Sequence, residues 1–263
     1  MDVVSSLWRF RGFILSSVKR EIQARYRNSL FGFAWMVIQP LAMIVVYTVI
    51  FAQLMRSRLP GVDGTFAYSI YLCAGILTWG LFSEIMHRMV VVFVDNANLI
   101  KKLNFPRLCL PLIVVLSAGF NFAIILGLFF AFLVISGNFP GWAVLALVPL
   151  LLVQVLFAAG LGGMLGVFNV FFRDVGQMFG VLIQFWFWFT PIVYPISVLP
   201  EWAAALMQLN PLLPLMEAYQ GILVLGRWPD WGRVAPIAAI AVLLCMYSVL
   251  LFRKHAGDMV DEL

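Results

Sequence analysis

The stretch from Leu108 to Ser136, LCLPLIVVLSAGFNFAIILGLFFAFLVIS, contains no acidic or basic residue. A helix needs about 20 apolar residues to cross the roughly 30 Å hydrocarbon core of a bilayer, so this stretch is long enough to span it. Its apolar residues do not alternate with polar ones, as they would in a barrel strand. The whole chain is 63% hydrophobic and only 11% charged, whereas roughly a quarter of the residues in soluble proteins are charged. The sequence therefore predicts an all-α integral membrane protein.

Further apolar stretches lie on both sides of this one and predict a transmembrane domain of six helices at residues 31–252. Pro40 should kink the first of these helices, because proline removes a backbone hydrogen bond. Gly162 and Gly166 form a small-xxx-small pair in the fourth helix and predict a close contact with a neighbouring helix. The six spans are predicted at about residues 31–55, 66–88, 108–136, 142–171, 177–194 and 234–252.

Six prolines divide residues 190–230 into segments such as Glu201–Leu209 and Leu212–Leu225. Each segment is too short to cross a bilayer as a straight helix. Half-helices that enter the membrane and return are tolerated only where they are buried in protein or line a cavity. We therefore predict a re-entrant region at about 196–226, between the fifth and sixth spans, beside a transport pathway.

Residues 1–30 carry apolar residues at spacings of three and four among several basic residues. This pattern predicts a retained amphipathic helix at the membrane interface, without signal-peptide cleavage. An ordinary basic flank that only sets topology fits the same charges equally well. The cations assigned to this interface helix are Arg9, Lys19, Arg20, Arg25 and Arg27.

The distribution of basic residues predicts the orientation in the membrane. With both termini in the cytoplasm, thirteen Lys and Arg residues lie inside and only four, at 56, 58, 227 and 233, lie outside. Cytoplasmic segments carry an excess of Lys and Arg, so this orientation is favoured. The same topology explains the net charge of +5 without nucleic-acid binding. It places the proline-rich region outside.

Residues 95–107 form a polar stretch between the second and third spans, on the predicted cytoplasmic side. The stretch is too charged for hydrocarbon, yet it holds apolar residues that a purely solvated loop would not need. We predict that it is a coupling loop that binds a partner, while its cations suit lipid headgroups as well. The candidate contact residues are Asn96, Asn98, Leu99, Ile100, Lys101, Lys102, Leu103, Phe105 and Arg107.

The chain lacks the motifs that would supply energy or catalysis. A phosphate-binding loop needs Gly-Lys followed by Ser or Thr, and no lysine has that context. No catalytic set is evident around His87 or His255, and three scattered cysteines predict neither a metal site nor a disulfide framework. A polyprenyl-lipid glycosyl or acyl transferase would need paired carboxylates, and a channel or secondary transporter would need polar groups inside the spans. The energy must therefore be supplied by something else.

Glu84, His87 and Arg88 share one helical face at the end of the second span. An interfacial ion pair with a bystander histidine is the favoured interpretation, and a proton relay is the alternative.

Five consecutive aromatic residues, 185–189, are followed by Tyr194. Rings can stack on the apolar faces of sugars, so a glycan path is one interpretation, and an interfacial aromatic belt is the other. Five successive rings point in all directions around a helix, so some must face protein or the pathway. The path candidates are Trp186, Trp188, Phe189 and Tyr194.

Several motifs in order resemble the membrane subunits of ABC-2 type polysaccharide exporters, in particular the Wzm O-antigen permeases. The resemblance covers about residues 15–226, with Leu103-Asn104 departing from the larger apolar side chain expected before Phe-Pro-Arg. The motifs are Lys19-Arg20-Glu21-Ile22, Arg25-Tyr26, Ser29-Leu30-Phe31-Gly32, Trp35, Gln39-Pro40-Leu41, Asn96 to Lys102, Phe105-Pro106-Arg107, Phe172-Arg173-Asp174, Thr190 to Pro195 and Leu209-Asn210-Pro211.

The resemblance implies a homodimer in the bacterial inner membrane that pairs with two copies of a Wzt-like ABC ATPase. The cargo would be a polyprenyl-diphosphate-linked O-antigen polysaccharide, with capsular polysaccharide or teichoic acid as alternatives in the same family. ATP and Mg²⁺ would bind the ATPase, and no cofactor is expected on this chain. The N-terminal helix and the loop at 95–107 would contact the ATPase, and residues 196–226 would cap the outer end of the path.

Overall fold

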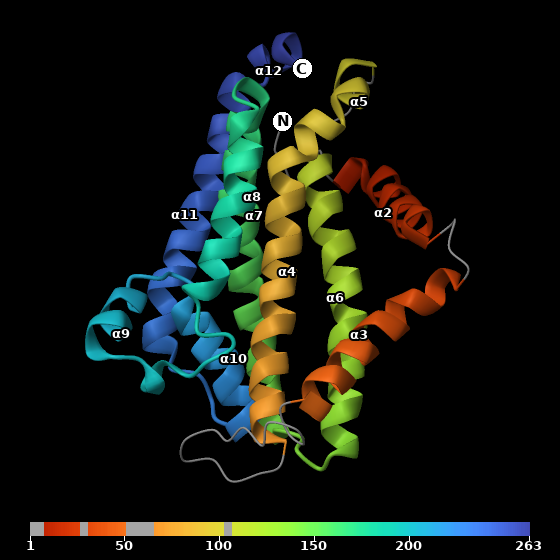
Figure 1. The fold of residues 1–263 in the computed structure, drawn as a ribbon. Coiled ribbons are helices and arrows are strands. Elements are labelled where there is room, and N and C mark those ends of the chain that lie inside the picture. The colour runs from red at the N-terminus through yellow and green to blue at the C-terminus, as the bar shows by residue number, and fades with distance from the viewer. Residues whose placement is uncertain (1–7, 27–30, 51–65, 103–106) are drawn as a thin grey trace.

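The computed structural model describes residues 8–26, 31–50, 66–102 and 107–263, and the regular elements in these ranges are all helices (Figure 1). Four helical segments are long and apolar enough to cross a membrane. They are α4 (Ala67–Asp95), α6 (Cys109–Ile135), η3 with α7 (Gly141–Ala146 and Leu147–Phe171) and α11 (Trp231–His255). The chain is therefore an integral membrane protein built from helices.

Shorter helices complete the described part of the chain. Two are apolar, α3 (Trp35–Tyr47), which continues to Ile50, and α10 (Leu213–Leu225). The division into six spans, with α3 and α8 as the first and fifth, stays a prediction. The remaining helices are α2 (Arg11–Tyr26), η1 (Gly32–Ala34), α5 (Ala97–Lys102), α8 (Asp174–Trp188), η4 (Ile196–Val198), α9 (Glu201–Met207) and α12 (Asp258–Glu262).

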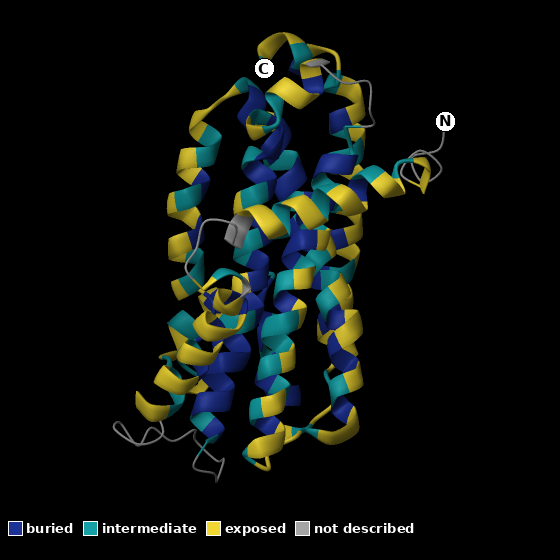
Figure 2. Cartoon of the chain, turned by 90° about the vertical axis from the view of Figure 1, so that its right-hand side faces the viewer, coloured by how far each residue is buried: buried dark blue, intermediate teal, exposed yellow. Residues whose placement is uncertain are grey.

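Helix α4 occupies the centre of the bundle and contacts α6, α7, α8 and α10. In its most apolar stretch 72% of the residues are buried, against 17% in α11 and 22% in α6. Figure 2, which looks onto α2 and α3, shows exposed residues along the outer faces of these two helices and buried residues behind them. The exposed side chains of α3, α6 and α11 are largely apolar, as expected for contact with lipid.

Helix α4 extends to Asp95, beyond the predicted end of the span at 88. Met89, Val90 and Phe93 continue its apolar face and are almost fully buried. The side-chain amide of Asn169 on α7 also donates to the Val90 carbonyl at 3.0 Å. The helix continues because this last part packs on α7 instead of entering solvent. We call the end of the bundle where α4 ends, and where α5 and α12 lie, the α5 end.

Helix α7 packs closely against two neighbours through glycines. A Cβ atom at Gly166 would lie 2.5 Å from the Met89 carbonyl oxygen on α4, and one at Gly162 would lie 2.7 Å from the Met89 Cβ. On another face, a Cβ at Gly160 would lie 2.6 Å from the Cys245 nitrogen on α11. The predicted close contact at Gly162 and Gly166 is confirmed, and its partner is α4.

The proline-rich region begins where α8 ends, at Trp188, before the predicted end of the span at 194. Its irregular backbone is held by side chains of the bundle. The Tyr71 hydroxyl donates to the carbonyls of Pro191 and Tyr194, both at 3.0 Å, and the Gln220 amide donates to Pro191 at 2.9 Å. Buried carbonyls outside a helix need such donors. Helices α9 and α10 lie within the two segments that the prolines delimit in the sequence.

Candidate functional site

Helix α5 forms part of the polar stretch between α4 and α6. Ile100 is 5% exposed and belongs to the main apolar core, whereas Leu99 is 38% exposed and Asn98 and Lys101 are also exposed. The Asn96 amide donates to the Val92 carbonyl at 2.8 Å, which holds the start of α5 on the end of α4. One side of α5 is therefore anchored and the other is accessible. Leu103, Phe105 and the side chain of Lys102 lie outside the described residues.

The C-terminal segment supports α5 from the other side. Helix α12 contacts α5 and α7, and its Met259 is 1% exposed. The Arg107 guanidinium donates to the Ala256 carbonyl, just after α11. No role was predicted for this acidic C-terminal segment, residues 256–263. The segment does contain apolar residues between its acidic ones, which could have indicated that it packs on the bundle. These residues, Met259, Val260 and Leu263, pack on the core.

Helix α2 lies across the outside of the bundle, against α6 (Figure 1). Its Ile14 is 4% exposed and packs with Cys109 and Ile113 of α6. The cations Lys19 and Arg20 are exposed, as is Arg9, which lies just before the helix. One side of α2 therefore packs on α6, while its cations lie on the accessible side. Arg27 and the side chain of Arg25 lie outside the described residues.

A network of charged and polar groups connects α2 to the bundle. Arg88 on α4 forms an ion pair with Glu21 on α2 and lies 3.7 Å from Glu84, one turn away on α4. Glu84 also accepts a hydrogen bond of 3.1 Å from the side-chain amide of Asn121 on α6. Three helices are thus joined by Glu21, Arg88, Glu84 and Asn121, which we call the ionic network.

The geometry favours the ion-pair interpretation of the residues that end the predicted second span. Glu84 and Arg88 face each other, but His87 interacts elsewhere. Its Nδ1 lies 2.9 Å from the Ser83 carbonyl, and its ring packs edge-on against Phe179, 5.9 Å between centroids. Glu21 could not be assigned from the sequence because it lies 67 residues from Arg88 and on a separate helix.

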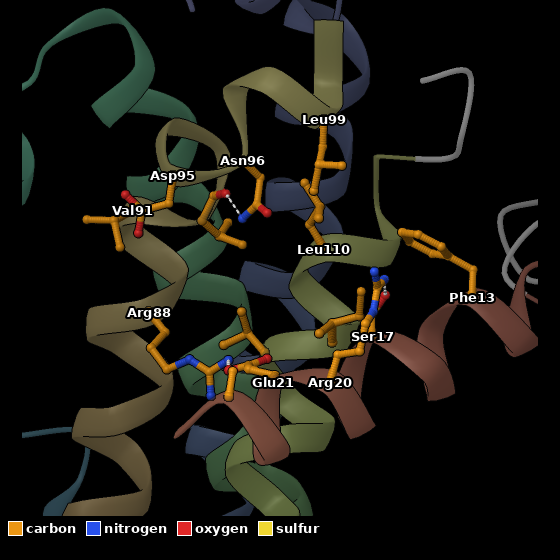
Figure 3. Close-up of a pocket in the computed structure, with 14 residues that line it drawn as sticks. Phe13, Ser17, Arg20, Glu21, Arg88, Val91, Asp95, Asn96, Leu99 and Leu110 are labelled. Atoms are coloured by element: carbon orange, nitrogen blue, oxygen red, sulfur yellow. Dashed lines mark hydrogen bonds and ion pairs between the residues drawn. The ribbon is translucent and has the colours of Figure 1, made fainter. Parts of the chain in front are cut away.

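A cavity of about 490 Å³ separates α2 from α5 (Figure 3). Phe13 of α2, Leu99 of α5 and Leu110 of α6 supply apolar walls. The charged lining residues are Arg20, Glu21, Arg88 and Asp95, so cations and anions balance. Close-packed interiors transmit displacement, whereas a gap allows relative movement. Helices α2 and α5 are therefore separated here, and each is attached to the bundle through its own contacts.

The aromatic run on α8 divides into inward and outward rings. The Trp186 ring packs against Phe82 at 5.4 Å, and its indole N–H donates to the Asn210 side-chain oxygen at 2.9 Å. Trp188 is 62% exposed, and Phe189 is also exposed. The Tyr194 hydroxyl donates to the Trp188 carbonyl. The structure therefore gathers Trp188, Phe189 and Tyr194 at one end of α8 and turns Trp186 toward the core.

These features define a class of protein: a multi-pass helical membrane subunit with an accessible helix and an attached interface helix at one end of the bundle. Among the described residues, no group of three or more His, Cys, Asp or Glu could hold a metal ion.

Comparison with known proteins gives the family. The model of the ABC-2 type transporter family matches residues 13–224, so the chain belongs to this family. Its membrane subunits lack an ATPase domain of their own, and membership implies a separate ATPase partner. The resemblance drawn from the sequence motifs is confirmed.

Two kinds of relative are similar over nearly the whole chain. The O-antigen export system permease protein RfbA of Myxococcus xanthus is 30% identical over 263 residues, which covers 99% of each chain. A protein of the same name from Klebsiella pneumoniae is 29% identical over 236 residues, covering 89% of this chain and 88% of the relative. The polysialic acid transport protein KpsM of Escherichia coli is 20% identical over 250 residues, covering 92% and 93%.

Proposed function

We propose that this chain is the permease subunit of an ABC transporter that exports a polyprenyl-diphosphate-linked O-antigen polysaccharide across the bacterial inner membrane. The observation that carries the proposal is the similarity to an O-antigen export permease over 99% of both chains. The energy comes from ATP hydrolysed on a separate subunit, which also binds the ATP and Mg²⁺.

The ATPase docks at the α5 end, which faces the cytoplasm. The accessible face of α5 offers Leu99 as an apolar contact, beside Asn98 and the charge of Lys101. Partner surfaces of this kind combine a small apolar anchor with a polar rim. The exposed cations of α2, Lys19 and Arg20, provide a second contact. The balanced cavity between the two helices lets each follow its own part of the ATPase.

Two routes carry movement from the ATPase into the membrane. Helix α5 is anchored through Ile100 in the core and through α12, which also contacts α7. Helix α2 is linked to α4 through Glu21 and Arg88. Because α4 is the central helix, and contacts both α8 and α10, displacement of α4 reaches the irregular stretch before η4.

The cargo passes between two copies of the chain. The exposed rings of Trp188 and Phe189, with Tyr194 beside them, are the candidates that line this path. Trp186 contributes by fixing α8 to Asn210, so its effect on export is indirect. Residues 196–226 form a re-entrant cap on the outer side of the membrane.

Export of a capsular polysaccharide is the second candidate. The similarity to a polysialic acid transport protein, at 20% identity over 92% of this chain, supports it. The higher identity to the O-antigen permeases favours O-antigen as the cargo. Teichoic acid export remains an alternative within the same family.

The experiment uses a bacterial strain whose O-antigen permease has been deleted. The strain receives this chain together with the ATPase that is the natural partner of this chain. The wild-type chain should restore polysaccharide to the cell surface. The variant Leu99→Asp with Lys101→Glu should lose co-purification with the ATPase by about 30-fold, because it removes an apolar anchor and reverses a charge. Arg227→Glu reverses an exposed charge outside the α5 end and serves as the matched control.

The outcomes separate the parts of the proposal. If the wild-type chain and its ATPase leave all polysaccharide inside the cell, the export function is wrong. If export is restored but the Leu99 and Lys101 variant binds the ATPase normally, the assignment of α5 as the docking surface is wrong. Normal behaviour of Arg227→Glu excludes a general effect of charge reversal on insertion.

A further inference from the structure

A second cavity, of about 610 Å³, lies within the predicted membrane region between α3, α4 and α6. Pockets of roughly 300–1,000 Å³ are typical of small-molecule sites, so this one has room for a short ligand segment. The apolar part of its lining includes Met36 and Met43 of α3 and Leu77 of α4. The polar part of its lining is unusual for a protein of this composition.

Polar side chains from three helices meet at this cavity. Gln39 comes from α3, Ser83 and Glu84 come from α4, and Asn121 comes from α6. The helices α4 and α6 are both long enough to span a membrane. Polar groups inside spans are costly in lipid and normally face protein or a water-filled cavity. Their convergence indicates a hydrated space and not an acyl-chain site.

The charges of the lining favour a neutral ligand that is rich in hydroxyl groups. Among the described residues of this lining, Glu84 is the one acidic residue and there is no Lys or Arg. Arg88 lies 3.7 Å from Glu84 and offsets its charge. A phosphate group would need free cations. Amides and a hydroxyl can both donate hydrogen bonds to sugar hydroxyls and accept them, and a carboxylate can accept them.

An aromatic ring completes the set. Trp35 lines the cavity and is 40% exposed. Its ring is braced by Phe31, edge-on at 5.6 Å between centroids. An exposed, braced indole provides a flat apolar face together with a hydrogen-bond donor. This combination matches the apolar face and hydroxyl edge of a pyranose ring.

We infer that this cavity is a sugar-binding subsite, in which Gln39, Ser83 and Asn121 hydrogen-bond a segment of the glycan while Trp35 stacks on it. The inference rests on the proposed function, which supplies a glycan as cargo. It adds a specific contact site at the α3 face of α4, separate from the exposed rings at the end of α8.

The subsite is connected to the ionic network. Asn121 and Glu84 line the cavity and also bond to each other, and Glu84 faces Arg88, which pairs with Glu21 on α2. A sugar that engages Glu84 therefore competes with Arg88 for this carboxylate. Occupancy of the cavity is coupled in this way to the attachment of α2.

The test is cysteine labelling in a chain whose Cys73, Cys109 and Cys245 are replaced by alanine. Single cysteines are placed at Gln39 and Ser83, and a control at Val45, which is exposed on α3 and does not line the cavity. Membranes are treated with a hydrophilic maleimide. We compare cells whose ATPase is inactivated by substitution, so that polymer accumulates, with cells that cannot start the polymer.

Without polymer, Gln39→Cys and Ser83→Cys should label and Val45→Cys should not, because only the first two face hydrated space. Accumulated polymer should slow labelling at both cavity positions. The variant Gln39→Leu should reduce export by about fivefold, as expected for one lost hydrogen bond, while Val45→Leu should leave export unchanged. Membrane yield of each variant controls for folding.

Equal labelling of the two cavity cysteines with and without polymer would contradict the subsite. So would the absence of labelling at both, which would mean that lipid or a second copy of the chain fills the space. Export by the cysteine-free parent separates this result from failure of the proposed function. If the parent restores surface polysaccharide but polymer does not protect the cysteines at 39 and 83, the function stands and the subsite is wrong.

Discussion

The two sides of α4 are packed in different ways. On the side of α7, glycines bring the backbones together, so that a Cβ at Gly166 would lie 2.5 Å from a carbonyl oxygen of α4. On the side of α2 and α3, cavities of about 490 and 610 Å³ remain and polar contacts bridge the helices. Tightly packed helices move together, whereas loosely packed ones can change their separation. The comparison indicates a rigid unit of α4, α7 and α11 and an adjustable unit of α2 and α3.

The largest effect is expected from a ring that anchors the rigid unit. Trp186→Ala removes contacts with Phe82 and Phe157 and the hydrogen bond to Asn210. We expect a loss of about 3 kcal/mol in stability, typical of an inward aromatic ring. Trp188→Ala, on the same helix but exposed, should leave stability unchanged and slow export. Thermal unfolding in detergent measures the loss of stability. Equal melting temperatures of Trp186→Ala and Trp188→Ala would contradict the assignment of Trp186 as the inward ring.

A smaller loss is expected from the glycine contact. Gly166→Ala should destabilise the protein by about 1–3 kcal/mol, because the added methyl must displace the Met89 carbonyl. Gly180→Ala on α8 is the control, since a Cβ there meets no atom within 4 Å. That control should be neutral or stabilising by up to about 1 kcal/mol. Equal melting temperatures of the two variants would show that the close approach of α7 to α4 does not contribute to stability.

The ionic network should contribute less to stability than either contact. Glu21 and Arg88 are partly exposed, and pairs of this kind contribute about 1 kcal/mol or less. A double-mutant cycle with Glu21→Gln and Arg88→Gln should give a coupling energy of that size. Both single variants should clearly reduce the amount of polysaccharide exported per ATP hydrolysed, while the free energy of unfolding changes little. Additive effects on both quantities would exclude a coupling role for the pair.

The smallest effect on global stability is expected at the C-terminal segment. Met259→Asp should detach α12 from α5 and α7 but leave the long helices folded, because the segment lies at the edge of the bundle. Hydrogen exchange should rise at Ala97–Lys102 and stay unchanged in α11. Asp261→Ala, an exposed position on the same helix, is the control. Unchanged exchange in α5 would show that α12 does not support it.

Much of the fold could be predicted from hydropathy and proline positions alone. The stretch Leu108–Ser136 became α6 (Cys109–Ile135), and the prolines delimited α9 and α10. The second span was predicted to end at 88, and the helix that contains it continues to Asp95, past Arg88. Its charge is offset by Glu21 and Glu84, so the helix continues past it. Local sequence contains no information about a partner on another helix.

The sequence predicted which residues belong to the candidate site but not which of them face the partner and which face the core. The sequence placed Leu99 and Ile100 together as contact residues, yet one is exposed and the other is buried, because only packing decides which face of α5 meets the core. The same limit applies to Trp186 and Trp188. The cavity lined by Gln39, Ser83 and Asn121 joins three helices, and no pattern within one segment could indicate it.

The division into a rigid and an adjustable unit is tested most directly by distances between spin labels in the complex with its ATPase. The first pair of labels, Leu15→Cys on α2 and Phe168→Cys on α7, reports the distance from α2 to α7. The second pair, Phe168→Cys and Leu250→Cys on α11, reports the distance from α7 to α11. Both pairs are placed in a cysteine-free chain that is diluted with unlabelled protomers. On trapping ATP hydrolysis, we expect the distance from α2 to α7 to change by about 2 Å or more and the distance from α7 to α11 to stay constant. A change in the second distance with none in the first would contradict the account.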